Sequence, residues 1–182
     1  MIRFDRALRF ACSALLVAVP AAAQLTSSSH KVNPLPIATV TVAQGKAVTA
    51  HLPFRVPEGL HINSNTPGSD LLIPTTLKLE PPTDISLTSL TYPKGEDKSF
   101  EFSPDTKLNV YSGDFTISVA VNAARSTPVG KYRVHGTLRY QACDDRQCFP
   151  PASVPMSLDV TVVKGTFKKT QHNPPQSPHV HN

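Results

Sequence analysis

The chain has 182 residues, a formal net charge of +5 and 40% hydrophobic residues, enough for one domain with a hydrophobic core. Its positive charges form no basic cluster interleaved with aromatic residues, which argues against nucleic acid as a partner. No serine–histidine–aspartate order, glycine-rich phosphate loop or paired acid/base motif points to a hydrolase or a nucleotide enzyme.

The first 23 residues have the features of a cleavable secretory signal. Three arginines stand within the first nine residues, residues 11–20 form a short apolar run, and residues 21–23 are small alanines. The apolar run is too short to span a bilayer. We therefore expect a signal peptide over residues 1–23, export, and a mature chain that begins at Gln24 and has lost Cys12.

Downstream of the signal, the sequence predicts strands and turns. Residues 24–36 are polar and proline-containing, as in an extended leader, and segment 93–104 is charged and turn-rich. Apolar residues show no sustained period of 3.6, and 18 prolines argue against long helices. The prediction is an all-β, immunoglobulin-like antiparallel β-sandwich over residues 37–163. Its expected strands are residues 37–42, 48–56, 71–73, 77–79, 86–92, 115–121, 132–140 and 156–162.

The composition changes after Val163. Residues 164–182 are polar, contain three prolines and have little to bury, so we expect a disordered tail. Its histidines, His172, His179 and His181, could ligate a transition metal, but a solvated tail is the favoured interpretation because ordering it would cost entropy. No metal and no cofactor are expected.

Cys143 and Cys148 stand between two alternating segments, 132–140 and 156–162, with four residues between them. If the segments pair as strands, the cysteines can face each other within the Cα separation that a disulfide tolerates. A ring of six residues stabilises a fold by only about 2 kcal/mol in the chain-entropy model. A bond that opens and closes and a small structural staple both fit this spacing.

The residues around the cysteines resemble a known family. The run Tyr140-Gln141-Ala142-Cys143, followed by four residues and then Cys148-Phe-Pro-Pro, resembles the N-terminal periplasmic domain of the thiol:disulfide interchange protein DsbD. Similar patterning extends over residues 35–163, although the familiar version has one more residue between the cysteines. The resemblance favours a redox-active pair and implies the same immunoglobulin-like fold.

The resemblance also implies a function. It implies an exported, periplasmic thiol–disulfide relay that passes electrons through Cys143 and Cys148 to oxidised periplasmic thiol proteins, as a protein-disulfide reductase-type interchange component. A membrane electron carrier or a thioredoxin-like domain would restore the reduced form. The alternative is a non-catalytic β-sandwich binding or assembly module with a structural disulfide.

The resemblance also implies roles for residues near the cysteines. In the family, a loop with an acidic residue followed by phenylalanine covers the cysteines, and Glu101-Phe102 matches this cap. In the alternative, both phenylalanines of this loop, Phe100 and Phe102, simply pack under it. Cys143 is expected to be held against Tyr140 and Gln141, whereas Cys148 follows a polar tip and is the thiol expected to meet a partner.

Overall fold

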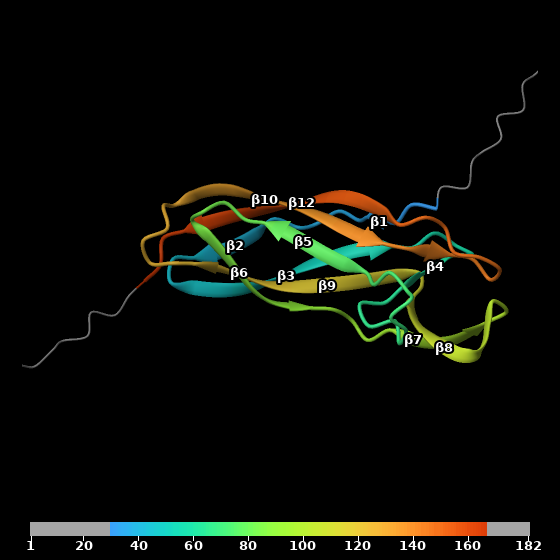
Figure 1. Ribbon diagram of the computed structural model, residues 1–182. Helices are drawn as coiled ribbons and strands as arrows, with labels where there is room; N and C mark the ends of the chain where they lie inside the picture. Colours follow the sequence, from blue (N-terminus) through green and yellow to red (C-terminus); the bar gives the residue numbers. More distant parts are fainter. Residues whose placement is uncertain (1–29, 167–182) are drawn as a thin grey trace, which may run out of the picture.

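The computed structural model describes residues 30–166, which form twelve strands arranged in three sheets (Figure 1). Two four-stranded sheets pack face to face and form what we call the sandwich. The third sheet, which we call the end sheet, lies at one end of the sandwich. The expected signal peptide and most of the expected tail, including its three histidines, lie outside the described residues.

The first sheet of the sandwich has the order β1-β3-β9-β6. β3 and β9 pair antiparallel over their whole length, from Lys46 opposite Ala123 to Arg55 opposite Asp114. Alternate residues of both strands are buried, because successive side chains of a strand point to opposite faces. The four strands are β1 (Asn33–Pro34), β3 (Lys46–Arg55), β9 (Asp114–Ala123) and β6 (Ile85–Thr91).

The second sheet of the sandwich has the order β2-β12-β10-β5. β10 and β12 pair antiparallel from Gly130 opposite Val162 to Tyr140 opposite Ala152, as the two alternating segments predicted. β12 pairs with β2 in parallel, which is the one parallel pair among the described strands. The four strands are β2 (Val40–Ala43), β12 (Ala152–Val163), β10 (Gly130–Tyr140) and β5 (Thr76–Glu80).

The hydrophobic core lies between these two sheets. The first sheet contributes fully buried side chains such as Leu52, Phe54 and Ile117, and the second contributes Leu138 and Leu158. Both sets come from the alternating segments of the sequence. The predicted all-β, immunoglobulin-like antiparallel sandwich is therefore confirmed.

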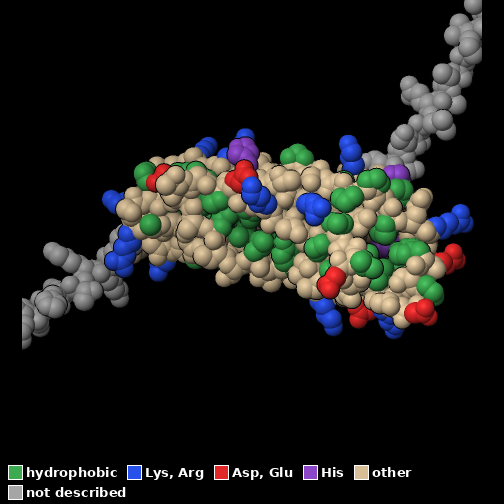
Figure 2. All heavy atoms as spheres, viewed as in Figure 1, with side chains coloured by type: hydrophobic (Ala, Val, Ile, Leu, Met, Phe, Trp, Pro, Cys, Tyr) green, Lys and Arg blue, Asp and Glu red, His purple; other side chains and the backbone are tan. Residues whose placement is uncertain are grey.

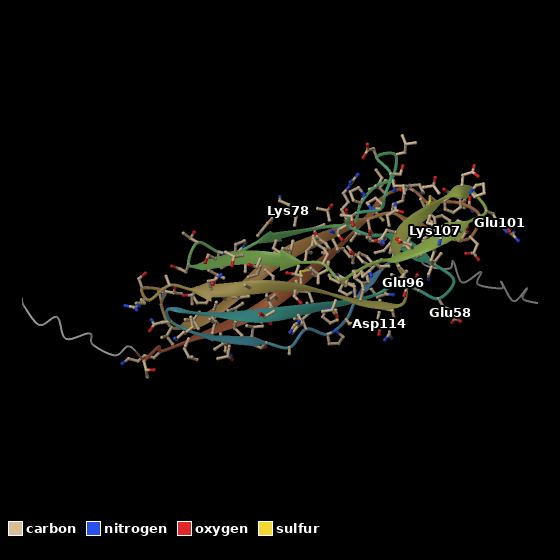
Figure 3. The ribbon with its side chains drawn as sticks, turned by 90° about the horizontal axis from the view of Figure 1, so that it is seen from below. Glu58, Lys78, Glu96, Glu101, Lys107 and Asp114 are labelled. Carbon is tan, nitrogen blue, oxygen red and sulfur yellow. A yellow bond between two sulfur atoms is a disulfide. The ribbon has the colours of Figure 1, made fainter. Side chains whose placement is uncertain are left out.

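The end sheet is smaller and has the order β11-β4-β8-β7. A separate small cluster of Phe100, Leu108 and Val110 packs beneath it, with Leu72 at its edge. The turn between β7 and β8 forms its outer tip, where Glu101 points away from the molecule (Figure 3). The strands are β11 (Ala142–Cys143), β4 (His61–Asn63), β8 (Ser103–Tyr111) and β7 (Glu96–Phe100).

Three segments differ from their sequence-based description. Val32 is buried in the core and β1 pairs with β3, so this part of the expected leader packs on the sandwich. Residues 71–73 form a turn, with Leu71 93% exposed, because their apolar side chains do not alternate. The segment expected to be turn-rich, 93–104, contains β7 and the start of β8.

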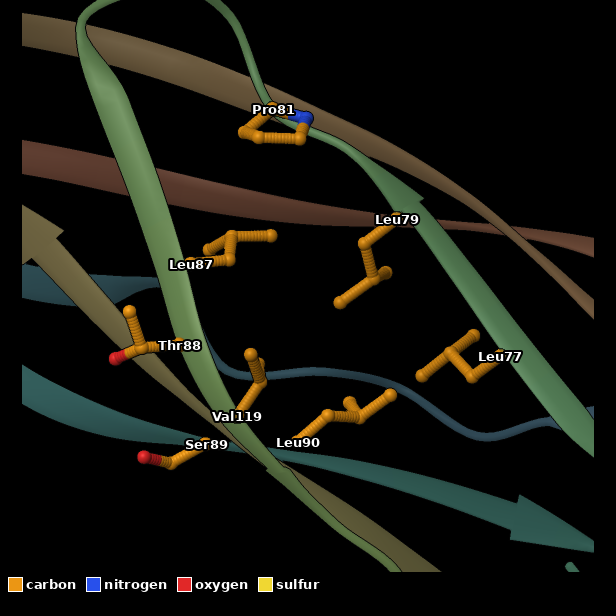
Figure 4. A pocket seen from close by; sticks show the side chains of 8 residues that line it. All are labelled: Leu77, Leu79, Pro81, Leu87, Thr88, Ser89, Leu90 and Val119. Carbon is orange, nitrogen blue, oxygen red and sulfur yellow. The ribbon is translucent and has the colours of Figure 1, made fainter.

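An open hollow of about 350 Å³ lies between β5 and β6, the edge strands of the two sandwich sheets (Figure 4). Leucines from both strands line it, and hydrophobic side chains gather on this face of the molecule (Figure 2). β6 breaks its pairing with β9 between Thr88 and Thr91, where Ser89 has a positive φ of 51°. On β5, exposed Lys78 and Glu80 form an ion pair with a nitrogen–oxygen distance of 2.8 Å.

Candidate functional site

Cys143 and Cys148 form a disulfide at the end of the molecule that carries the end sheet. The two Sγ atoms are 2.07 Å apart and the two Cα atoms 4.0 Å apart. Cys143, in β11, is fully buried, whereas Cys148 is partly exposed. One sulfur is therefore held inside the fold and the other lies nearer the surface.

The turn that joins the cysteines is closed by its own hydrogen bonds. The Asp144 carboxylate accepts bonds from the backbone N–H groups of Arg146 and Gln147, both at 2.8 Å, and these bonds lower the pKa of Asp144. The Asp144 N–H donates to the carbonyl of Gln147 at 2.9 Å. The predicted polar tip is thus a compact turn, and it brings Cys148 opposite Cys143.

Gln141 ties this turn to the end sheet. Its Nε2 donates to the carbonyl of Phe149 at 3.2 Å, and its Oε1 accepts from Asn63 Nδ2 at 3.3 Å. The same Asn63 nitrogen donates to the carbonyl of Ile73 at 3.0 Å. Gln141 and Asn63 therefore link three segments of the chain next to the cysteine turn.

Tyr140 points away from the turn, into the sandwich. Its side chain is fully buried, and its hydroxyl accepts a hydrogen bond from the Val32 N–H at 3.0 Å. This contact fixes the last residue of β10 and the first described residues of the chain together. Tyr140 thus holds the strand that leads into Cys143.

His61 lies directly opposite Cys143 in the β11–β4 pair. Its side chain is only 4% exposed, and its Nε2 has no hydrogen-bond partner. Burial lowers the pKa of His61 to about 4, against the opposing effects of Asp145 and Asp144, and Lys98 lowers it further. The cysteine motif does not point to His61, because only the strand register brings this residue to Cys143.

Three rings form a stack that begins at His61. Phe100 packs on the imidazole with ring centroids 4.0 Å apart, and Phe102 packs on Phe100 at 5.3 Å. Phe100 is almost fully buried, whereas Phe102 is 37% exposed and Glu101 is exposed at the tip of the turn. The expected cap residues therefore lie at the outer end of the stack, and Phe100 is the ring that covers His61.

A second pair of rings lies on the other side of the cysteine turn. His30 stacks on Phe149, the residue after Cys148, with ring centroids 3.7 Å apart. The Phe149 N–H donates to the carbonyl of Ala142 at 2.8 Å, which keeps the two arms of the turn together. Aromatic side chains thus flank both ends of the turn.

The described residues offer neither a metal centre nor a membrane-spanning helix. Within residues 30–166, no group of three or more histidine, cysteine, aspartate or glutamate side chains is arranged to hold a metal ion. No helix in this range has the length and hydrophobicity needed to cross a membrane.

The chain resembles several solved structures. It is similar to the reduced DsbD N-terminal domain of Neisseria meningitidis, with 23% identity, 64% of this chain and 78% of that chain covered, and a TM-score of 0.38. It is also similar to the complex of the DsbD and PilB N-terminal domains from that organism, with 18% identity, coverages of 74% and 87%, and a TM-score of 0.43. A third similar structure is the seventh ScaB type I cohesin from Pseudobacteroides cellulosolvens, with 13% identity, coverages of 78% and 98%, and a TM-score of 0.47. No curated protein matches the chain.

A family model gives the strongest of these comparisons. The model described as thiol:disulfide interchange protein DsbD, N-terminal, matches residues 31–159. This range contains most of the sandwich, the whole end sheet and both cysteines of the disulfide. The chain therefore belongs to the family of the DsbD N-terminal domain.

Proposed function

We propose that this protein is an exported thiol–disulfide relay that passes electrons through Cys143 and Cys148 to oxidised periplasmic proteins. The observation that carries the proposal is the unequal placement of the two sulfurs in a turn of the DsbD N-terminal family: Cys143 is buried in a strand, and Cys148 is partly exposed. A structural staple gains nothing from such inequality, whereas stepwise exchange with a partner uses it.

Each half of the relay is a pair of thiol–disulfide exchanges. In the reduced protein, the Cys148 thiolate attacks a disulfide of the acceptor and forms a mixed disulfide, releasing one acceptor thiol. Cys143 then attacks the Cys148 sulfur, which closes the ring and releases the second acceptor thiol. Two electrons leave the protein. A thioredoxin-like domain or a membrane electron carrier would reverse both exchanges and restore the dithiol.

The roles of the two cysteines are tested by trapping. Cys143→Ser keeps the exposed thiol and lacks the second one, so it should accumulate a mixed disulfide with an oxidised thioredoxin-like protein. Cys148→Ser keeps only the buried thiol and should trap little. Reversed yields would exchange the two roles, and no trapping by either variant would remove support for the relay.

The reduction potential separates the relay from a module with a structural bond. A structural disulfide should have a potential below about −300 mV, and a relay should lie nearer the working couples of thiol–disulfide exchange. Equilibration of the protein with defined dithiol and disulfide mixtures measures this value. A potential below that limit would favour the non-catalytic binding or assembly module.

Export is proposed on the sequence and family alone. The signal-like residues 1–23 and the DsbD N-terminal family both support a periplasmic location. Mass spectrometry of the exported protein should find Gln24 at its N-terminus. A mature protein that retains Met1 would contradict the proposed signal peptide.

A further inference from the structure

Three residues on adjacent segments of the site form one cross-strand row. Cys148 lies opposite Cys143, and Cys143 lies opposite His61. Residues directly opposite each other in antiparallel pairs project to the same face, with Cβ atoms about 4.5–5.5 Å apart. The side chains of His61 and Cys143 therefore project to the same face of the end sheet from paired positions on adjacent strands.

The imidazole is enclosed and carries an unused polar atom. His61 is 4% exposed, Phe100 covers its ring at 4.0 Å, and its Nε2 has no hydrogen-bond partner. A buried polar atom without a partner destabilises the fold, because it has lost its hydrogen bonds to water. The oxidised sulfur of Cys143 has no hydrogen to donate, whereas the reduced Cys143 thiol has one.

We propose that His61 Nε2 accepts the proton of the Cys143 thiol when the dithiol closes to the disulfide. The proposal rests on the proposed function only in taking Cys143 as the thiol that closes the ring. As the Cys143 sulfur attacks Cys148, its S–H bond breaks and the proton moves to Nε2. The Cys143–Cys148 bond forms, and the bond between Cys148 and its partner breaks. The partner leaves as a thiolate and its sulfur is reduced, the Cys143 sulfur is oxidised from thiol to disulfide, and the Cys148 sulfur stays at the disulfide level. The imidazolium then returns its proton to that thiolate or to water.

Burial and the charges around His61 set its protonation state. Burial lowers its pKa, Asp145 raises it, Lys98 of β7 lowers it and Asp144 raises it. On its remaining neighbours, β11 presents Cys143, and β8 presents Tyr111 opposite Ile62 rather than opposite His61. The net result is an imidazole that is neutral throughout the neutral pH range, so its basic nitrogen is free when the thiol reacts, while the lowered pKa makes it a weaker base than an exposed imidazole.

The test follows the ring-closing step alone, with a chromogenic pyridyl disulfide as the probe. The reduced full-length protein releases one thione when the first thiol is modified and a second when the ring closes. If only free thiolate reacts, the rate of the second release should rise about tenfold per pH unit below the thiol pKa. If His61 accepts the proton, the rate of the second thione release should change less than about tenfold between pH 5 and 8, because His61 stays neutral over this range.

Variants identify the group responsible. His61→Phe keeps an aromatic ring against Phe100, and His61→Gln keeps a polar side chain, but neither can take up the proton. Both should slow the second release at least about tenfold at pH 6 and restore its steep pH dependence. His135→Gln, which changes an exposed histidine of β10, is the matched control and should behave as the wild type.

Two outcomes would overturn the inference. The first is a steep, thiolate-like pH dependence in the wild-type protein, which decides the matter even if the His61 variants do not fold. The second is a release rate that still depends only weakly on pH in folded His61 variants. This result would mean that His61 is only a packing residue. The probe needs no protein partner, so failure of the relay itself would appear in the trapping experiment and not here.

Discussion

The sandwich and the end sheet are held together by different kinds of contact. In the sandwich, β10 and β12 pair continuously from Gly130 to Tyr140, and a large apolar core lies beneath them. In the end sheet, β11 and β4 share two register pairs, and Asn63 Nδ2 donates hydrogen bonds to Ile73 and Gln141. Ile62 and Ala142 of these two strands also pack in the core of the sandwich. The long strand pairs and most of the apolar core therefore lie in the sandwich, whereas the disulfide lies in the end sheet, in another part of the same domain.

A core truncation should give the largest effect on stability. Leu138 is fully buried in the sandwich, and Leu138→Ala should lower the free energy of unfolding by about 2–5 kcal/mol. Leu108→Ala, in the small cluster under the end sheet, is the matched change and should cost less because that cluster is small. Urea denaturation measures both. Equal losses of unfolding free energy would show that the two regions are equally well packed and unfold together.

The next effect depends on pH and comes from His61. Its pKa is about 4 in the folded protein and near 6.5 when unfolded, so the unfolded chain binds the proton first as pH falls. The free energy of unfolding should therefore decrease as the pH falls from 6.5 to 4, by up to about 3 kcal/mol. Below pH 4, His61 is protonated in both states and should cause no further loss. Urea denaturation at several pH values in this range should show that the free energy of unfolding depends less steeply on pH in His61→Gln than in the wild type. An unchanged slope would assign the acid sensitivity to other groups.

Removal of the disulfide should cost less than a core truncation. The ring contains six residues, so the Cys143→Ser, Cys148→Ser double variant should lose about 2 kcal/mol and still fold at room temperature. Circular dichroism and thermal denaturation check this. A double variant that fails to fold would mean that the end sheet stabilises the sandwich, which would contradict the separation described above.

Phe102→Ala should have the smallest effect on stability and a clear effect on reactivity. The ring is 37% exposed and contacts Phe100 at the outer end of the stack. Its loss should leave the thermal midpoint almost unchanged and speed the alkylation of the reduced thiols. Phe100→Ala, which uncovers His61, provides the comparison and should reduce stability more. Unchanged alkylation with a large loss of stability would make Phe102 a packing residue.

The fold could be predicted where one face of a strand is buried. Residues 115–121, 132–140 and 156–162 alternate because their inward side chains fill the core, and each lies in an observed strand. β7 was not predicted, because its residues Glu96–Phe100 are mostly charged or polar and exposed. The strand expected at 71–73 was wrong, because apolar composition alone does not define a buried face.

The site could be predicted only in part. Sequence spacing and motif indicated the Cys143–Cys148 pair, since both residues lie close together in the chain. His61 could not be found in this way, because it reaches the site through the pairing of β4 with β11. Phe100 stands beside Phe102 in the segment considered for the cap, but the motif did not show that Phe100 is the ring that stacks on His61. Such contacts depend on strand register, which short strands with few alternating residues do not encode locally.

The open hollow between β5 and β6 has a consequence for solubility. Two unpaired strand edges beside a leucine-lined surface could template the addition of strands from other copies of the chain. The exposed ion pair of Lys78 and Glu80 places charge on one edge, and the irregular backbone at Ser89 breaks the other. Both features oppose edge-to-edge polymerisation. The sandwich can therefore expose an apolar surface between β5 and β6 without promoting aggregation through these strand edges.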